Sequence, residues 1–528
     1  MASDSPPTSR LANLFLDPKG PELVFGIVGG TGVDTKAVAA ALERELDDAG
    51  FGTTVLSPST YLRDVGKDLL GRAEPETPED ERIKYLQDVG NELRKRTARG
   101  DAAAILTLGG VLDARARAGK PPLHSLGKHA FIFRSLKNPQ EVDALRRIYG
   151  SSFILIGAHT SKPIRLERLA RKIGRSRGHT VLWGRAKEEC EHLAAVAIER
   201  DEAEGDALGQ NVRDTFALSD VFIDADDKSE MGASLKRFVD SLFHHPYNTP
   251  SRHEYCMFHA EAARLRSSAL GRQVGAVVAS DDGEIVAVGS NEVPKFGGGQ
   301  YWEGDPNDAR DFQKGEEVSD RMKRQALKQV LESLQAVGWK PQDDKVLTDD
   351  YVDELLAKMK GGLLANTIEF GRVEHAEVAA IMSAATRGTS VRDLTLYTTT
   401  FPCHDCTRHI ISAGIKRVYY IEPYAKSLGP QLHADAISVD QPNSDEPKVK
   451  FLPFIGIGPR IYQDVFRMEN RKQNGQLVTW FQAKESPRFG LKDATYLVRE
   501  SDELDDIRTK MKGAGLSVDP TDDQGAQT

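Results

Sequence analysis

One histidine and two cysteines, carried by two short motifs, constrain this chain more than any other feature. The first motif is His375-Ala-Glu377 and the second is Pro402-Cys403-His-Asp-Cys406. One imidazole and two thiolates supply three ligands for zinc and leave the fourth position open, as a catalytic site requires. The fold must therefore bring two separate segments of the chain to one point.

The apolar pattern around the two motifs predicts where each one lies in the fold. It indicates helices at 375–386 and 403–413 and strands at 394–399 and 417–421. Each motif then opens a helix, whose positive dipole end favours thiolate. At the first helical turn, His375 and Glu377 can both point off the helix end, so that Glu377 would move a proton during catalysis.

Taken singly, each motif is weak. H-x-E is common by chance, and C-x-x-C also suits a structural zinc half-site or a redox pair. Strand–helix alternation and Pro402 favour the joint, catalytic interpretation. The string His259-Ala-Glu261 repeats the first motif without a C-x-x-C at the right distance, so we expect it in an opening helix at 253–269. Four further residues are expected to be exposed or to pack in the interior: Cys190, Cys256, His404 and His409.

The two motifs in this order are the signature of zinc-dependent deaminases, and their surroundings resemble deoxycytidylate deaminases. The resemblance rests on Arg272-Gln-Val-Gly-Ala-Val-Val278 and Val288-Gly-Ser-Asn-Glu-Val-Pro294. It implies an α/β/α sandwich around one zinc ion per chain. It also implies a hydrolase acting on a cyclic amidine C–N bond, which converts dCMP to dUMP and ammonia.

The same resemblance implies substrate contacts. Asn291 should hydrogen-bond the sugar, and the backbone of 398–401 should lie near the cytosine amine. The segment 421–428 follows the last strand of this pattern, where substrate contacts cluster in such folds. There we interpret Tyr424 as a stacking partner of the base and Lys426 as a phosphate contact, although a solvated loop charge explains Lys426 equally well.

The N-terminal half has the pattern of a separate α/β domain over 21–243. A buried strand at 22–29 is followed by a glycine-rich turn, an amphipathic helix and a strand at 53–56, which begins a parallel sheet. Three apolar runs predict further strands, at Ala102–Leu108, Ala130–Phe133 and Phe153–Ile156.

The turn Gly26-Ile-Val-Gly-Gly-Thr-Gly-Val-Asp-Thr35 resembles a degenerate P-loop. A working P-loop, G-x-x-x-x-G-K-[ST], needs a lysine, but Gly32 or Val33 stands in its place and Lys36 comes too late. Asp34 adds negative charge where phosphates would sit. This argues against phosphoryl transfer and leaves nucleotide binding and a scaffold role open. The candidate nucleotide-binding residues are Gly26, Gly29, Gly30, Gly32 and Thr35.

The whole chain over 21–500 is similar to a bacterial anti-phage group that fuses a kinase-like domain to such a deaminase. In the N-terminal half the similarity also rests on 133–142, on 145–150 and on 165–171, which resembles a kinase lid. It implies depletion of deoxycytidine nucleotides during infection. A basic cluster suits a phosphate-facing lid or a solvated helix face: Arg165, Arg168, Arg171, Lys172, Arg175 and Arg177.

We expect a P-loop-kinase-like domain, a linker at 244–252 and a deaminase domain at 253–470. An insertion at 295–368 would interrupt the deaminase domain as a lid, an oligomer contact or a simple surface insertion. The remaining expected segments are a disordered tail at 1–20, an extension at 471–500 and a disordered tail at 501–528.

Composition limits the partners. No run reaches the ~18 apolar residues that span a membrane, and the N-terminus lacks a signal-peptide pattern, so we expect a cytoplasmic protein without membrane contact. The net charge of −9 argues against an extended nucleic-acid-binding surface, which would be basic. Free deoxycytidine nucleotides are the expected substrates, and the family implies a homo-oligomer. A polynucleotide deaminase, a nucleotide-sensing kinase-like switch, and control by a regulatory nucleotide or an inhibitory RNA stay open.

Overall fold

The computed structural model divides the chain into two compact units. The first comprises Met1–Ser251 and Ile455–Thr528, and the second is Arg252–Phe454. Both are α/β structures, which confirms the expected fold class. Among the described residues, no helix is both long enough and apolar enough to cross a membrane. The described residues are 22–121, 123–202, 208–340, 347–359, 362, 367, 369–424, 426–467, 470–480, 486–490 and 495–516, so the expected tail at 1–20 lies outside them.

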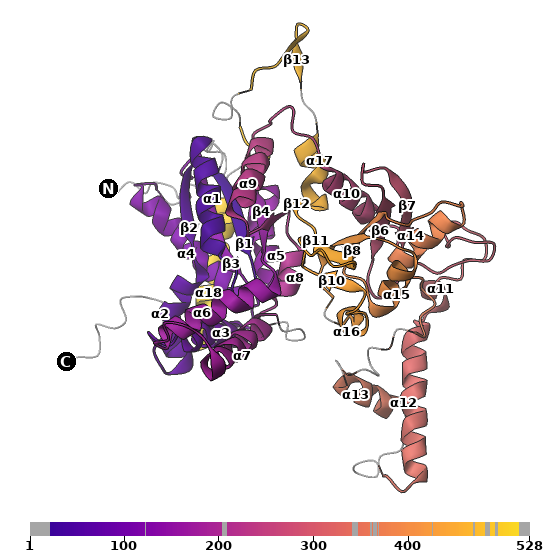
Figure 1. The fold of residues 1–528 in the computed structure, drawn as a ribbon. Coiled ribbons are helices and arrows are strands. Elements are labelled where there is room, and N and C mark those ends of the chain that lie inside the picture. Colours follow the sequence, from indigo (N-terminus) through magenta and orange to yellow (C-terminus); the bar gives the residue numbers. More distant parts are fainter. Residues whose placement is uncertain are drawn as a thin grey trace, which may run out of the picture. The chain divides into compact units, whose positions relative to one another are not determined.

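The first unit is built on a six-stranded sheet in the order β12-β5-β4-β1-β3-β2, parallel except for β12 (Figure 1). All of β1 is buried, as expected for a parallel strand that is covered on both faces. The strands are β1 (Glu22–Val28), β2 (Gly52–Leu56), β3 (His129–Leu136), β4 (Phe153–His159), β5 (Val221–Asp224) and β12 (Gly456–Ile457). A separate two-stranded hairpin joins β13 (Lys472–Gln473) and β14 (Gln476–Leu477).

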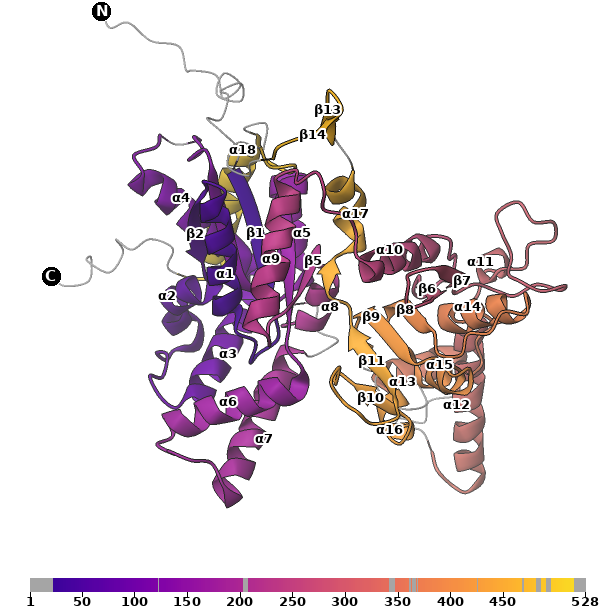
Figure 2. The ribbon, with the colours of Figure 1, turned by 45° about the horizontal axis from the view of Figure 1, so that its top comes forward.

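Helices cover both faces of this sheet (Figure 2). Leu23 and Phe25 of β1 share a core with α1 (Thr35–Asp48) and α9 (Lys228–Leu242), whereas the alternate residue Val24 belongs to the core of the other face. The other helices before the linker are α2 (Pro58–Leu70), α3 (Glu79–Thr97), α4 (Ala102–Arg117), α5 (Pro139–Tyr149), α6 (Lys162–Ser176), α7 (Gly184–Asp201) and α8 (Val212–Ala217).

The expected strand at Ala102–Leu108 is wrong, because this segment opens helix α4. Its alanines favour helix, and Ala102, Ala103, Ala104 and Ile105 are all buried. A short, uniformly apolar run fits a buried strand or a buried helix equally well, and periodicity alone does not distinguish the two.

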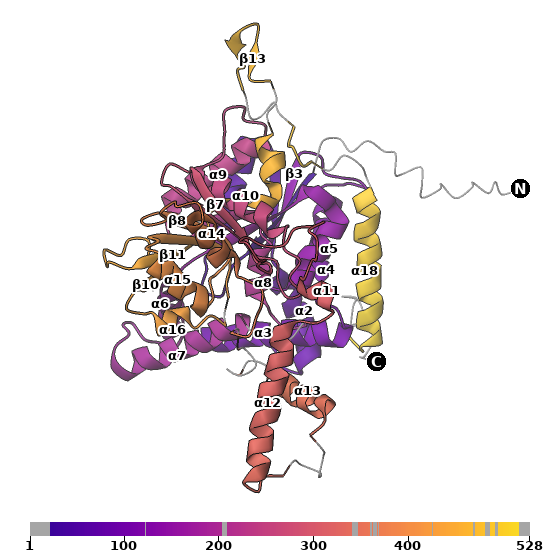
Figure 3. The same ribbon diagram turned by 90° about the vertical axis from the view of Figure 1, so that its right-hand side faces the viewer.

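The expected C-terminal boundaries are also wrong. The chain returns to the first unit at Ile455, where β12 pairs with β5 and α17 (Pro459–Phe466) follows. The segment 501–513, expected to be disordered, belongs to helix α18 (Thr495–Gly513), which runs beside α4 and α5 (Figure 3). Its buried residues recur at helical spacing between acidic ones: Leu497, Leu504, Ile507 and Met511.

Buried charges join α18 to the sheet. The guanidinium of Arg115 on α4 pairs with Glu22 of β1 at 2.8 Å and with Glu500 of α18. The Tyr149 hydroxyl donates to Glu500 at 2.7 Å, and the Tyr496 hydroxyl donates to Glu22 at 2.7 Å. Burial raises the pKa of Glu500, and its two hydrogen-bond donors offset part of that effect.

The second unit is a sheet in the order β10-β11-β9-β8-β6-β7 between two layers of helices. Its strands are β6 (Gly275–Ala279), β7 (Ile285–Ser290), β8 (Thr395–Thr400), β9 (Arg417–Glu422), β10 (Ile437–Val439) and β11 (Val449–Pro453). β6 is antiparallel to β7 and β8, and the other pairs are parallel. Helix α10 (Arg252–Arg264) packs on β6 and β8.

The opposite face of the second sheet carries α14 (Ala376–Ala385) and α15 (His404–Ser412), as the sandwich predicts. Two glycines of adjacent strands permit close approach of the two layers. A Cβ at Gly275 would lie 2.0 Å from the Ala260 carbonyl of α10, and one at Gly289 would lie 2.2 Å from the Ala376 carbonyl of α14. A short helix, α16 (Gly429–Leu432), follows β9.

Replacing Ile507 with Ala should lower the free energy of unfolding of the first unit by about 2–5 kcal/mol, because the fully buried side chain leaves a cavity. Arg508→Ala, an exposed change on the same helix, should stay within about 0.5 kcal/mol. Urea titration followed by circular dichroism compares the two variants. Equal effects would mean that α18 does not pack as described.

Candidate metal centre and active-site pocket

The first turns of two helices bring the two motifs together. His375 is the N-cap of α14, Glu377 lies in its first turn, and Cys403 is the N-cap of α15. The close approach of α14 to β7 at Gly289 holds the first of these helix ends against the sheet. As expected, the two motifs meet at the N-terminal ends of these two helices.

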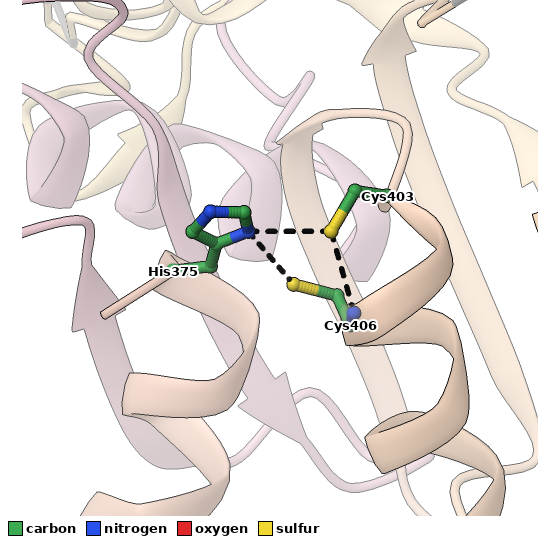
Figure 4. A group of neighbouring side chains, drawn as sticks. All are labelled: His375, Cys403 and Cys406. Carbon is green, nitrogen blue, oxygen red and sulfur yellow. Dashed lines mark hydrogen bonds between the residues drawn. The ribbon is translucent and has the colours of Figure 1, made fainter. Parts of the chain in front are cut away.

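The three candidate ligand atoms lie close enough to share one ion (Figure 4). His375 Nδ1 is 3.3 Å from the Sγ atoms of both Cys403 and Cys406, and all three atoms lie within 4.8 Å of one another. Tetrahedral zinc with Zn–S of about 2.3 Å and Zn–N of about 2.0 Å places its ligand atoms roughly 3.5–3.8 Å apart. The two nitrogen–sulfur distances therefore match a shared zinc ion after shifts of a few tenths of an ångström.

The electrostatics of this cluster favour a cation. Hydrogen bonds from Cys406 and His375 lower the pKa of Cys403 to about 4, so that its thiolate is favoured. The adjacent thiolate and burial raise the pKa of Cys406 well above its ordinary value. The hydrogen bond to Cys403 raises the pKa of His375 to about 9. Loss of the Cys406 proton would place a second thiolate beside the first, and a divalent ion between the two sulfurs would stabilise both charges.

Glu377 lies beside the cluster and is 4% exposed. Its Oε2 accepts a hydrogen bond from Cys406 Sγ at 3.4 Å. Burial raises its pKa to about 7, and the neighbouring Cys403 thiolate adds to the shift. A carboxyl group with a pKa near neutrality both takes and gives a proton at physiological pH, as a general acid–base residue must.

A cavity of about 320 Å³ opens onto this cluster, within the size range of small-molecule sites. His375, Glu377 and Cys403 line its polar part. Its other walls are formed by residues of the β6–β7 region, the insertion, and the ends of β8 and β9: Ala269, Leu270, Gly271, Arg272, Val274, Asn291, Asp311, Glu317, Val373, Ala376, Thr400, Phe401, Tyr424 and Lys426.

All three expected substrate-contact residues line this cavity. The Asn291 side chain also bridges two loop segments, because it accepts from Val274 N at 2.6 Å and donates to the Arg272 carbonyl at 2.5 Å. The Arg272 guanidinium lies 5.6 Å from the centre of the Tyr424 ring. Lys426 is exposed at the cavity wall.

The sequence did not identify every wall residue. Arg272 begins a run that carried the family resemblance, but its own role was not assigned. Asp311 and Glu317 come from the insertion, and no motif marks them. Arg372 holds this wall in place because its Nη1 donates to Asp311 Oδ1 at 2.8 Å and to the Ala309 carbonyl at 3.1 Å.

The insertion has an ordered base and two outer helices. At the base, Gln300 Nε2 donates to the Ser290 carbonyl of β7 at 2.8 Å. The outer helices pack on each other through a small cluster centred on Leu327, Leu331 and Val352. The helices of the insertion are α11 (Asp311–Lys314), α12 (Val318–Ala336) and α13 (Asp349–Lys358).

The repeated string His259-Ala-Glu261 lies on α10, as expected, and Glu261 pairs with Arg264 at 2.7 Å. Cys190 and Cys256 are buried, as the packing interpretation predicts. His404 is the first residue of α15 and His409 lies in its last turn, and neither belongs to the cluster of possible ligands found among the described residues.

The glycine-rich turn belongs to the first unit, at the end of β1. Asp34 caps α1, because its carboxylate accepts a hydrogen bond from Ala37 N at 3.0 Å, which gives the residue a structural role at the start of the helix. In the basic cluster of α6, most side chains pair with carboxylates, which favours an ion-paired helix face. The pairs are Arg165–Glu202, Arg168–Asp226, Arg171–Glu167, Lys172–Glu79 and Arg177–Asp80.

Comparisons with known proteins agree with this site. A sequence model of the cytidine and deoxycytidylate deaminase zinc-binding region matches residues 250–422. Over 53 residues the chain is 45% identical to the deoxycytidylate deaminase of Enterobacteria phage T2, a match that covers 10% of this chain and 28% of the phage protein. Residues 250–422 therefore contain such a region, and its metal is zinc, which His375, Cys403 and Cys406 could hold.

Two solved structures align with parts of the chain at low scores. The dCMP deaminase from cyanophage S-TIM5, in apo form, aligns over its full length with 39% of this chain, at 19% identity and a TM-score of 0.21. A gluconokinase from Sinorhizobium meliloti 1021 aligns over 96% of its length with 43% of this chain, at 14% identity and a TM-score of 0.20. Similarities at these scores carry no argument about this chain.

Replacing Cys406 with Ser should abolish zinc binding, because the cluster loses one of its two thiolates and a hydroxyl is a poor zinc ligand. Cys190→Ser, a change at a buried cysteine of the first unit, should leave the zinc content unchanged. Metal analysis of the purified proteins measures both. Full zinc content in Cys406→Ser would place the metal elsewhere.

Proposed function

We propose that the chain hydrolyses the 4-amino group of a free deoxycytidine nucleotide, dCMP or dCTP, to give the deoxyuridine nucleotide and ammonia. The observation that carries the proposal is the buried Glu377 beside the His375–Cys403–Cys406 cluster at one cavity. The match of residues 250–422 to the deaminase zinc-binding region supports it.

His375, Cys403 and Cys406 would hold the zinc ion, which supplies Lewis-acid activation of the attacking water when it is bound. Glu377 would accept a proton from that water and deliver it to the leaving amine. The pKa of Glu377, about 7, suits both transfers. Phe401 and Tyr424 offer apolar surface to the pyrimidine ring, and burial keeps bulk water from the carboxyl group.

The charges around the cavity suit a phosphorylated substrate. Arg272 and Lys426 are exposed cationic residues of its wall. Lys426 can pair with a phosphate oxygen, and Arg272 can do so in addition to its ion pair with Glu422 at 3.6 Å. Asn291 lines the same cavity and, as the resemblance implies, would hydrogen-bond a sugar hydroxyl. The net charge of −9 weighs against a polynucleotide substrate, which requires an extended basic track.

The wider role follows from the family resemblance alone. A bacterial cell would use this deaminase in its cytoplasm to deplete deoxycytidine nucleotides during phage infection. Because constant depletion would harm the cell, a regulatory nucleotide or an inhibitory RNA would restrain the enzyme, and a homo-oligomer is the expected assembly. The glycine-rich turn Gly26–Thr35 is a candidate for the regulatory nucleotide.

Replacing Glu377 with Gln should lower dCMP or dCTP turnover by about 10²–10⁴-fold while zinc stays bound, because the proton carrier is lost and the ligands are unchanged. The matched control is Glu261→Gln, in the second H-A-E string, which should keep full turnover. Deaminated product is quantified from dCMP, dCTP, cytidine, dATP and a cytosine-containing oligonucleotide.

The substrate panel separates the alternatives. Product from the oligonucleotide alone would replace the free-nucleotide proposal with a polynucleotide deaminase. No product from any substrate by the zinc-loaded wild type would favour a sensing role for this unit. Full turnover by Glu377→Gln would remove Glu377 from the chemistry.

The insertion should divide into an essential base and a dispensable outer part. Replacing 320–358 by a short glycine-serine linker should keep turnover within about twofold, because the outer helices pack mainly on each other. Deleting 300–365 should abolish turnover, because it removes Gln300 and the wall residues Asp311 and Glu317. Steady-state kinetics compare the two deletions. Unchanged turnover in the larger deletion would leave the insertion with no part in the site.

A further inference from the structure

A buried carboxylate faces the glycine-rich turn of the first unit. Asp201, the last residue of α7, is 0% exposed. Its Oδ2 accepts from the Thr31 backbone N–H at 2.7 Å and from Lys137 Nζ at 2.8 Å. Its other oxygen, Oδ1, is buried without a hydrogen-bond partner among the described residues. One carboxylate oxygen therefore accepts hydrogen bonds from both a backbone N–H of the turn and a lysine.

A turn N–H and an ammonium group converging on one oxygen are the donors that a phosphate-binding loop presents. Lys137 also donates to the Gly29 carbonyl at 3.1 Å, which fixes the ammonium at the turn. It lies immediately after β3, and β3 is the neighbour of β1 in the parallel sheet. The turn has no lysine at the P-loop position in its own sequence, and Lys137 at the end of the adjacent strand supplies a cation there instead.

Helices α6 and α7 close the turn from the other side. Arg165 of α6 donates to the Thr31 carbonyl at 3.4 Å and pairs with Glu202 at 2.7 Å. A Cβ at Gly30 would lie 2.4 Å from Arg165 Nη1, and Gly32 has φ +96° and faces the same side chain. These glycines are required by the close approach of α6, so that their presence alone does not indicate a nucleotide.

We propose that this turn is a binding site for a phosphate group, that Lys137 is its cation, and that Asp201 occupies it as an internal anion until a phosphate displaces it. Entry of a phosphate requires the end of α7 to withdraw its carboxylate. The site is distinct from deamination, and its ligand is inorganic phosphate or the phosphate end of a nucleotide.

The proposal predicts weak binding by the wild-type chain. A phosphate would meet the Asp201 carboxylate within a few ångströms, where like charges in a buried site repel strongly. Asp201→Asn keeps the shape and a hydrogen-bond acceptor but removes the charge. It should tighten phosphate binding by at least about tenfold.

The test is isothermal titration of the full-length wild type and Asp201→Asn with inorganic phosphate, ATP and GTP. Adding Lys137→Met to Asp201→Asn should abolish the gain, whereas adding Lys36→Met should preserve it. Lys36 is the exposed lysine one residue after Thr35, and it provides the matched control. Tighter binding of ATP and GTP than of phosphate identifies a nucleotide site, and equal affinities identify a site for the phosphate group alone.

Two outcomes would overturn the proposal: Asp201→Asn binds no tighter than wild type, or the Lys137→Met double variant binds as tightly as Asp201→Asn. Thermal unfolding checks that each variant is folded, and Asp201→Ser repeats the test if the amide destabilises α7. None of these titrations depends on turnover of a cytosine nucleotide. A failure here therefore leaves the proposed deamination untouched, and the converse also holds.

Discussion

The second unit depends on one electrostatic constraint: an imidazole and two cysteines share a buried space in which the pKa of Cys403 is lowered and that of Cys406 is raised, so that a divalent cation is needed to hold both sulfurs as thiolates. The surrounding structure serves this constraint. Gly289 lets α14 lie close against β7. The N-terminal end of α14, capped by His375, therefore lies beside the N-terminal end of α15, capped by Cys403. The positive ends of two helices add to the stabilisation of the thiolates.

The first unit contains charges that are buried as deeply, but their ion-pair partners come from the chain itself. Arg115 lies between Glu22 and Glu500, and Lys137 pairs with Asp201. Removing one partner of such a pair leaves an uncompensated buried charge, which is strongly destabilising. The pairs therefore fix which segments must meet, and they explain why the C-terminal helix belongs to the first unit despite its acidic sequence.

The sequence predicted features that depend on one short segment, and it did not predict contacts between segments that are far apart in the chain. The metal cluster was predictable because each motif opens a helix and His375 and Cys403 are caps. Ala102–Leu108 was assigned wrongly because a uniformly apolar run has no period, and α18 was missed because acidic residues stand between its buried ones. The cavity walls from the insertion were not predictable, because only folding brings Asp311 beside Arg372.

The same distinction explains the glycine-rich turn. The P-loop motif is incomplete in the sequence because the lysine that contacts the turn, Lys137, is about a hundred residues further along the chain. Parallel strands end at the same edge of a sheet, so residues after β1 and β3 become neighbours there whatever their separation in sequence. Lys137 and Asp201 balance each other at that edge, and the turn is complete without a ligand. In the His375–Cys403–Cys406 cluster, by contrast, the raised pKa of Cys406 means that a metal ion is needed to hold both sulfurs as thiolates.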